Sequence, residues 1–189
     1  MKQEFYDAVE ASPVIAAVKN TEDLKRCCQM EEIQVVFLLF GDVCSISDLT
    51  AQIKDAGKIA MVHIDLITGL SPREVAVDFI HKNTLADGII STKPALIRRA
   101  AELSMYTVLR YFLLDSMALE NIRLQQHQVR PDFIEILPGV MPQIIKRVSK
   151  SIKTPIIAGG LITDKEEVMA ALNAGAMAIS STNHKVWSL

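Results

Sequence analysis

The sequence predicts an α/β protein in a single domain, residues 1–189: a compact (β/α)8 barrel of the TIM type with short loops. Short apolar runs rich in β-branched residues recur eight times, and their starts lie 19 to 29 residues apart. Each run precedes a helical pattern, and each is apolar throughout, as in parallel strands covered on both faces. Eight such units close a barrel with an outer ring of helices. The alternative, an open doubly wound sheet, has five or six strands in its commoner forms.

The eight strands are predicted to begin near Pro13, Val35, Ile59, Gly88, Thr107, Phe133, Pro155 and Ala178. Such spacing leaves room for one strand, one short helix and two tight loops. Ser71 and Thr163 are the predicted caps of two helices, because each is followed three residues later by glutamate. Asp115 is predicted to cap the helix after the fifth strand. Gly57 and Gly175 fit the C-terminal ends of helices.

Composition excludes several classes of protein. Half of the 189 residues are hydrophobic, the formal net charge is −2 and the mean hydropathy is +0.25, so the chain is not disordered. The apolar stretch Val35–Phe40 is far short of the roughly 20 residues that a bilayer requires, and residues 1–7 resemble no secretory signal. A pI near 6.1 argues against a globally basic nucleic-acid binder. The cysteines Cys27, Cys28 and Cys44 suit reduced thiols, so we expect a cytoplasmic protein.

Barrels of this class typically need about 250 residues, so 189 residues leave little room after the last strand. Only residues 183–189 remain for a short C-terminal helix. We expect so short a helix to leave the first strand poorly covered. The sequence therefore suggests a homodimer in which the partner subunit supplies the cover.

Chemistry in such barrels belongs to the C-terminal mouth, where polar residues follow the predicted strands. Glycines after strand seven and hydroxyls after strand eight occupy the two loops that commonly hold a phosphate, because glycine allows close approach of peptide N–H groups and hydroxyls complete the shell. Three cations could neutralise a phosphate dianion. The alternative is that the Gly-Gly pair only permits a tight turn. The candidates are Gly159, Gly160, Ser180, Ser181 and Thr182 for the phosphate, with Lys19, Lys93 and Arg110 as cations.

Two carboxylates, Asp65 and Glu135, complete the predicted mouth. They could accept hydrogen bonds from a polyol or act as general acid and base, or they could simply pair with the nearby cations. His63 should lie on the same side as Asp65, either as its partner or as a hydrogen-bonded core residue. Glu135 stands where barrel aldolases often carry a Schiff-base lysine, and a carboxylate cannot form an imine. The sequence has none of the common zinc-protease, serine-hydrolase or nucleotide-binding motifs, so we predict no catalytic residue, metal site or cofactor.

These segments resemble the bacterial glycerol-3-phosphate-responsive antiterminator family from about Pro13 to Trp187. The Ala-Gly-Gly element is shared by many phosphate-binding barrels, whereas Glu-Ile-Leu-Pro-Gly together with Phe-Leu-Leu-Asp-Ser is much more particular. The segments that carry the resemblance are His63–Leu66, Gly88–Thr92, Arg110–Ser116, Pro131–Gly139, Pro155–Gly160, Ala174–Ala176 and Ser181–Asn183 with Trp187.

The resemblance implies a transcriptional regulator that binds glycerol 3-phosphate at the mouth and then a leader mRNA of a glycerol-utilisation operon. The alternative is a lyase or isomerase of the same fold that acts on a small phosphorylated polyol or sugar, with Asp65 and Glu135 as acid and base. The residues alone do not indicate RNA binding. A basic stripe of Lys146, Arg147 and Lys150 is the RNA-binding candidate, in a stretch of 28 residues without a carboxylate. An ordinary solvated helix face is the alternative for this stripe.

Overall fold

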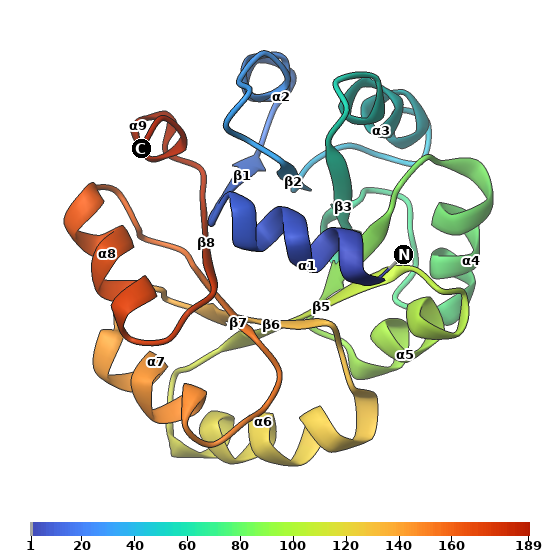
Figure 1. The fold of residues 1–189 in the computed structure, drawn as a ribbon. Coiled ribbons are helices and arrows are strands. Elements are labelled where there is room, and N and C mark those ends of the chain that lie inside the picture. The colour runs from blue at the N-terminus through green and yellow to red at the C-terminus, as the bar shows by residue number, and fades with distance from the viewer. Residues whose placement is uncertain (1) are drawn as a thin grey trace.

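Eight parallel strands close a barrel in chain order (Figure 1). This computed structural model describes residues 2–189, without the side chains of residues 2, 126 and 127. Each predicted strand start is confirmed to within one residue, and so is the (β/α)8 fold class. The strands are β1 Val14–Val18, β2 Val35–Leu38, β3 Ile59–His63, β4 Gly88–Ser91, β5 Tyr106–Phe112, β6 Phe133–Leu137, β7 Ile156–Gly159 and β8 Ala178–Ser181.

Helices cover the outside of this ring between the strands (Figure 1). Within residues 2–189, none of them has the length and apolar character needed to cross a membrane. They are α2 Thr21–Cys28, α3 Ile46–Asp55, α4 Glu74–Asn83, α5 Pro94–Glu102, α6 Ser116–Val129, α7 Pro142–Ser149, α8 Lys165–Asn173 and α9 His184–Trp187, with a 3-10 turn, η1, at Ile64–Leu66.

The predicted helix ends are partly confirmed. The Asp115 carboxylate accepts a hydrogen bond from the Ala118 N–H at 2.9 Å, as expected of a cap. The cap of α8 is Asp164, one residue after the predicted Thr163, and it accepts from the Glu167 N–H at 2.9 Å. The prediction at Ser71 is wrong: Arg73 keeps an extended backbone, so α4 begins only at Glu74.

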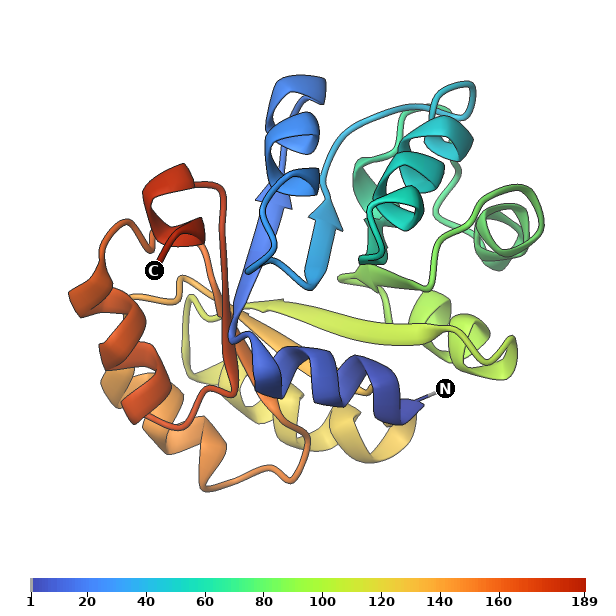
Figure 2. The ribbon, with the colours of Figure 1, turned by 45° about the horizontal axis from the view of Figure 1, so that its top comes forward.

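An additional helix, α1 Lys2–Ala11, precedes the first strand and was not predicted. Figures 1 and 2 show it lying across the end of the ring where the strands begin. Its side chains Phe5 and Val9 are fully buried among apolar residues of the barrel interior. The Phe5 ring lies 4.9 Å, centroid to centroid, from Tyr106 and from Phe133. The N-terminal end of the barrel is therefore closed by hydrophobic packing.

The barrel interior changes character along its axis. Near the start of β5 and β6 the inward side chains are Tyr106, Val108 and Phe133, all in one apolar cluster. Further along the same strands the inward residues are Arg110 and Glu135, which are register partners. Because side chains alternate along a strand, this succession brings a buried charged pair to the C-terminal mouth.

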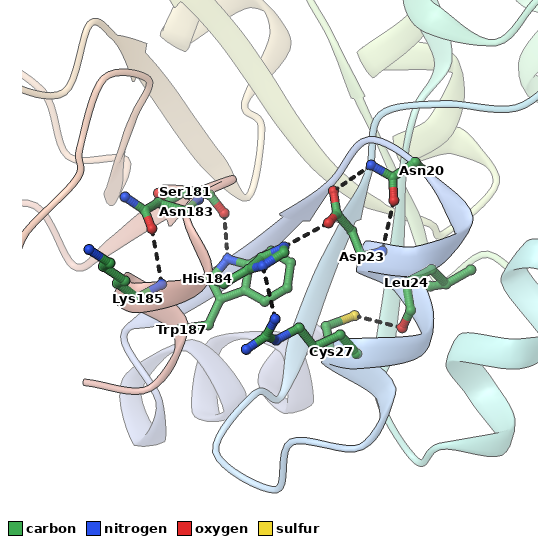
Figure 3. Close-up of polar contacts among 10 residues, drawn as sticks. Asn20, Asp23, Leu24, Cys27, Ser181, Asn183, His184, Lys185 and Trp187 are labelled. Atoms are coloured by element: carbon green, nitrogen blue, oxygen red, sulfur yellow. Dashed lines mark hydrogen bonds and ion pairs between the residues drawn. The ribbon is translucent and has the colours of Figure 1, made fainter.

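The C-terminal helix α9 packs against both β1 and β8 and so covers the seam between them, and Figure 3 shows its residues beside Asp23 of α2. The Trp187 side chain is fully buried, and its indole N–H donates to the Ser181 carbonyl at 2.7 Å. His184 Nε2 lies 2.6 Å from the Asp23 carboxylate of α2 and links the two helices. The expectation of a poorly covered first strand is wrong, because all five residues of β1 are buried and both α2 and α9 pack against that strand. The expectation of a homodimer at this seam rested on that poor cover, so the packing gives it no support.

Candidate ligand site at the barrel mouth

A buried ion pair lies beneath the mouth. The Arg110 guanidinium donates through Nε to Glu135 Oε2, and the Ser180 hydroxyl donates to Glu135 Oε1 at 2.6 Å. Glu135 is fully buried. A carboxylate in such a place is costly unless it is paired and hydrogen-bonded, and here each of its oxygens has a partner. The expectation that carboxylates of the mouth pair with its cations is met at this position.

Gly159 makes room for this arrangement. A Cβ atom on Gly159 would lie 2.6 Å from Glu135 Oε1 and 2.6 Å from the Ser180 hydroxyl. No side chain fits between two groups that are hydrogen-bonded to each other. Gly160, by contrast, has a φ of +76°, a region that favours glycine, and turns the chain out of β7. The two glycines therefore have different structural tasks.

A cavity of about 360 Å³ opens above the pair. One side is formed by Arg110 and Glu135, and the other by the loops that follow β7 and β8. Six of the ten predicted ligand residues lie in its wall: Arg110, Glu135, Gly160, Ser180, Ser181 and Thr182. Thr163 and Asn183 also line it and were not predicted. Their positions in the sequence could have indicated this, because Thr163 lies three residues after Gly160 and Asn183 directly follows Thr182.

Hydrogen bonds join the two loops into one wall. The Ser181 hydroxyl donates to the Ile162 carbonyl at 2.8 Å and accepts from the Asn183 N–H at 3.0 Å. The Asn183 amide donates to the Thr163 carbonyl at 3.1 Å. The Ser181 hydroxyl thus makes its hydrogen bonds within the wall itself, whereas the neighbouring Thr182 is exposed.

A second polar cluster lies around Asp65 and is separate from this cavity. The Asp65 carboxylate accepts from the Thr92 N–H and from Lys93 Nζ, both at 2.8 Å, and from the Ser91 hydroxyl at 3.0 Å. Burial raises the pKa of Asp65, but the bonds from Lys93, Thr92 and Ser91 outweigh burial and hold this pKa below its usual range. Lys19 is exposed and lines neither place. Asp65 and Glu135 line different hollows, so nothing in their placement favours a shared acid–base role.

His63 is buried just below the mouth, and among the described side chains its Nδ1 is the one buried polar atom without a hydrogen-bond partner. The expectation of a hydrogen-bonded core histidine is therefore wrong. Burial, reinforced by the positive charge of Arg110, lowers the pKa of His63 to about 4. The imidazole is neutral at pH 7, since this value lies far below that pH.

Replacing His63 by leucine is expected to raise the free energy of unfolding by about 1 kcal/mol at pH 7, because an unsatisfied buried nitrogen costs about 1–3 kcal/mol. Acid should enlarge the difference. The unfolded chain binds a proton near pH 6.5 and the folded chain only near pH 4, so stability falls as the pH drops across this interval. Urea unfolding at several pH values measures both effects. A variant that is less stable than the wild type at pH 5 would contradict this account.

The fold and the cavity define a class: a (β/α)8 barrel with a polar cavity at its C-terminal mouth. The family model described as "Glycerol-3-phosphate responsive antiterminator" matches residues 14–187. The chain belongs to this family. It is 44% identical over 178 residues to the uncharacterized protein YgcP of Escherichia coli (strain K12), covering 94% of this chain and 93% of that protein.

Two solved structures extend the comparison. The glycerol uptake operon antiterminator regulatory protein of Listeria monocytogenes superposes with a TM-score of 0.89 at 31% identity, over 93% of this chain and 94% of that chain. A glycerol uptake operon antiterminator-related protein of Thermotoga maritima superposes with a TM-score of 0.84 at 32% identity, over 94% and 99%. The family resemblance expected from the sequence is confirmed.

Proposed function

We propose that the chain is an antiterminator of glycerol-utilisation operons that binds glycerol 3-phosphate in the mouth cavity and then a leader mRNA. The proposal assigns the phosphate to the wall built by Gly160 and Thr182. It assigns the glycerol hydroxyls to Glu135 and Arg110. Family membership supports the regulatory role, and the composition of the cavity supports the ligand.

One observation carries the ligand assignment: a buried, paired carboxylate forms one side of a cavity whose other side consists of glycine and hydroxyl residues. Carboxylates accept hydrogen bonds from hydroxyl groups, and glycine loops at this position of a barrel suit phosphate. The cavity thus offers one polar side to a polyol and another to a phosphate. A small phosphorylated polyol is the ligand class that uses both.

Isothermal titration calorimetry with glycerol 3-phosphate tests the ligand assignment. We expect saturable binding to the wild type and at least tenfold weaker binding to Gly159→Ala, because the added Cβ pushes the Glu135 carboxylate away from Ser180. Asp65→Asn is the matched control, since it changes the other polar cluster. Weaker binding to Asp65→Asn and unchanged binding to Gly159→Ala would move the ligand to the Asp65 cluster. Absence of heat with the wild type would refute the assignment.

The RNA contact is assigned to the basic stripe of Lys146, Arg147 and Lys150. All three are exposed on α7 or at its end, and none has an ion-pair partner within residues 2–189 as described. Phosphate contacts make RNA affinity depend on salt, with a slope of about −0.7 per contact on single strands. Replacing all three by alanine should reduce the magnitude of that slope by about 2.

Filter binding of a leader RNA at several salt concentrations, with and without glycerol 3-phosphate, measures this slope. A control variant should remove the same charge from other exposed helices, at Lys82, Arg98 and Lys165. If the salt dependence of RNA affinity has the same slope in both variants and in the wild type, α7 does not contact the RNA. That outcome would leave the ligand assignment unaffected.

A further inference from the structure

Exposed apolar side chains are frequent in one segment of the chain, residues 112–124. Of the twelve large apolar side chains that are exposed among the described residues, four lie here: Phe112 (52% exposed), Leu114 (84%), Met117 (72%) and Leu124 (59%). Exposed apolar residues scattered singly need no explanation, but contiguous ones mark interaction sites. This segment is therefore the strongest candidate for a contact that the isolated chain leaves open.

Helix α6 carries apolar residues on two opposite sides. Ile122 and Val129 are buried against the barrel. Met117 and Leu124 are seven residues apart, which is two helical turns, so they share a side of the helix. That side points away from the core, because both residues are exposed. A helix with a second apolar stripe on its outer side is typical of one that packs against another element.

Charged residues next to this outer stripe indicate what packs there. Glu120 and Arg123 flank it on the same side of α6, both are exposed, and neither has an ion-pair partner within the described part of the chain. When a twofold axis relates two identical antiparallel helices, the same edge of each helix lies against the same edge of the other. Glu120 of one helix therefore meets Arg123 of the other. Met117 of one helix then lies close to Leu124 of the other, because the two pairs are centred only one residue apart, on either side of Asn121. The stripe is complementary to itself in apolar surface and in charge.

We propose that a second copy of this chain binds here, with α6 of one protomer antiparallel to α6 of its partner about a twofold axis that passes near Asn121. An isologous contact of this kind closes as a dimer. A stripe with one acid and one base has no net charge to attract RNA, so the face is distinct from the basic stripe on α7. A contact of one helix is small, and we expect association at micromolar concentrations.

Sedimentation velocity on the full chain from about 1 to about 200 μM tests the proposal. The mass should rise from 20.9 kDa toward twice that value. Leu124→Glu should weaken dimerisation at least tenfold. Val75→Glu is the matched control, because Val75 is also an exposed apolar residue (62%) but lies on α4; it should not change the dissociation constant. A wild type that stays monomeric throughout, or a dimer indifferent to Leu124→Glu, would overturn the proposal.

Charge reversal tests the antiparallel arrangement in particular. Glu120→Arg and Arg123→Glu should each weaken the dimer, because either change places like charges across the axis. The double variant should restore association, since each arginine then meets a glutamate of the partner. These residues lie outside the mouth cavity, so binding of glycerol 3-phosphate should be unchanged. Equal dissociation constants for the single and double variants would refute the antiparallel contact.

Discussion

Arg110→Met is expected to lower the free energy of unfolding by about 3–5 kcal/mol at pH 7, because it leaves a buried carboxylate without its cation. Glu135 is fully buried and would retain only the Ser180 hydroxyl as a partner. Methionine fills most of the volume that arginine occupied, so the loss reports charge rather than a cavity. Urea unfolding measures it. For a chain of this length the loss corresponds to a fall in Tm of about 6–20 °C.

The double variant Arg110→Met/Glu135→Leu separates the cost of an unpaired charge from the value of the pair. Replacing a buried ion pair by apolar residues of similar size is often neutral, so we expect the double variant to recover most of the lost stability. It should nevertheless bind no glycerol 3-phosphate, since both proposed hydroxyl partners are gone. A single Arg110→Met variant that costs less than about 1 kcal/mol would show that Glu135 reaches solvent.

The strand pattern was predictable because it depends on local sequence. Apolar β-branched runs at a regular spacing specify parallel strands between helices, and eight of them close a ring. The helix α1 was not predictable in the same way. Phe5 and Val9 become core residues only because the chain folds back over the end of the barrel, and this is a long-range contact. The start of α4 was misplaced because the extended backbone of Arg73 outweighed the local cap signal of Ser71.

Only part of the cavity lining could be predicted from the sequence. Residues that end neighbouring strands must lie close together in a parallel barrel, so Arg110, Glu135 and Ser180 could be expected at one mouth. Strand order does not reveal which mouth residues share a cavity. Asp65 and Lys93 pair with each other beside β4, on another part of the rim. Only atomic packing separates these two clusters.

Gly159 has a structural role that differs from the one its sequence context suggested. As half of a Gly-Gly pair it suggested a phosphate loop, whereas in the structure a side chain at this position would collide with the Glu135 carboxylate and the Ser180 hydroxyl. A close approach of this kind leaves no periodic signal in the sequence. The absence of a side chain at Gly159 therefore maintains the charge arrangement under the cavity. The loop that lines the cavity begins one residue later, at Gly160.

Trp187→Ala is expected to lower the free energy of unfolding by about 3–5 kcal/mol, the usual cost of truncating a fully buried tryptophan. The indole covers the seam between β8 and β1, and α9 is too short for another residue to take its place. Thermal unfolding followed by circular dichroism measures the loss. Trp187→Phe is the control: it retains a large ring but removes the indole N–H, and should cost about 1 kcal/mol.

The same variant connects the seam to the cavity. The Trp187 N–H holds the Ser181 carbonyl, and Ser181 is followed directly by Thr182 and Asn183 in the cavity wall. Loss of this anchor should loosen the β8–α9 loop, so glycerol 3-phosphate should bind more weakly to Trp187→Ala and to Trp187→Phe than to the wild type. Leu189→Ala, at an exposed position two residues away, should change neither stability nor affinity. If Trp187→Phe binds the ligand as tightly as the wild type, the hydrogen bond to Ser181 does not shape the cavity, and the seam acts through packing alone.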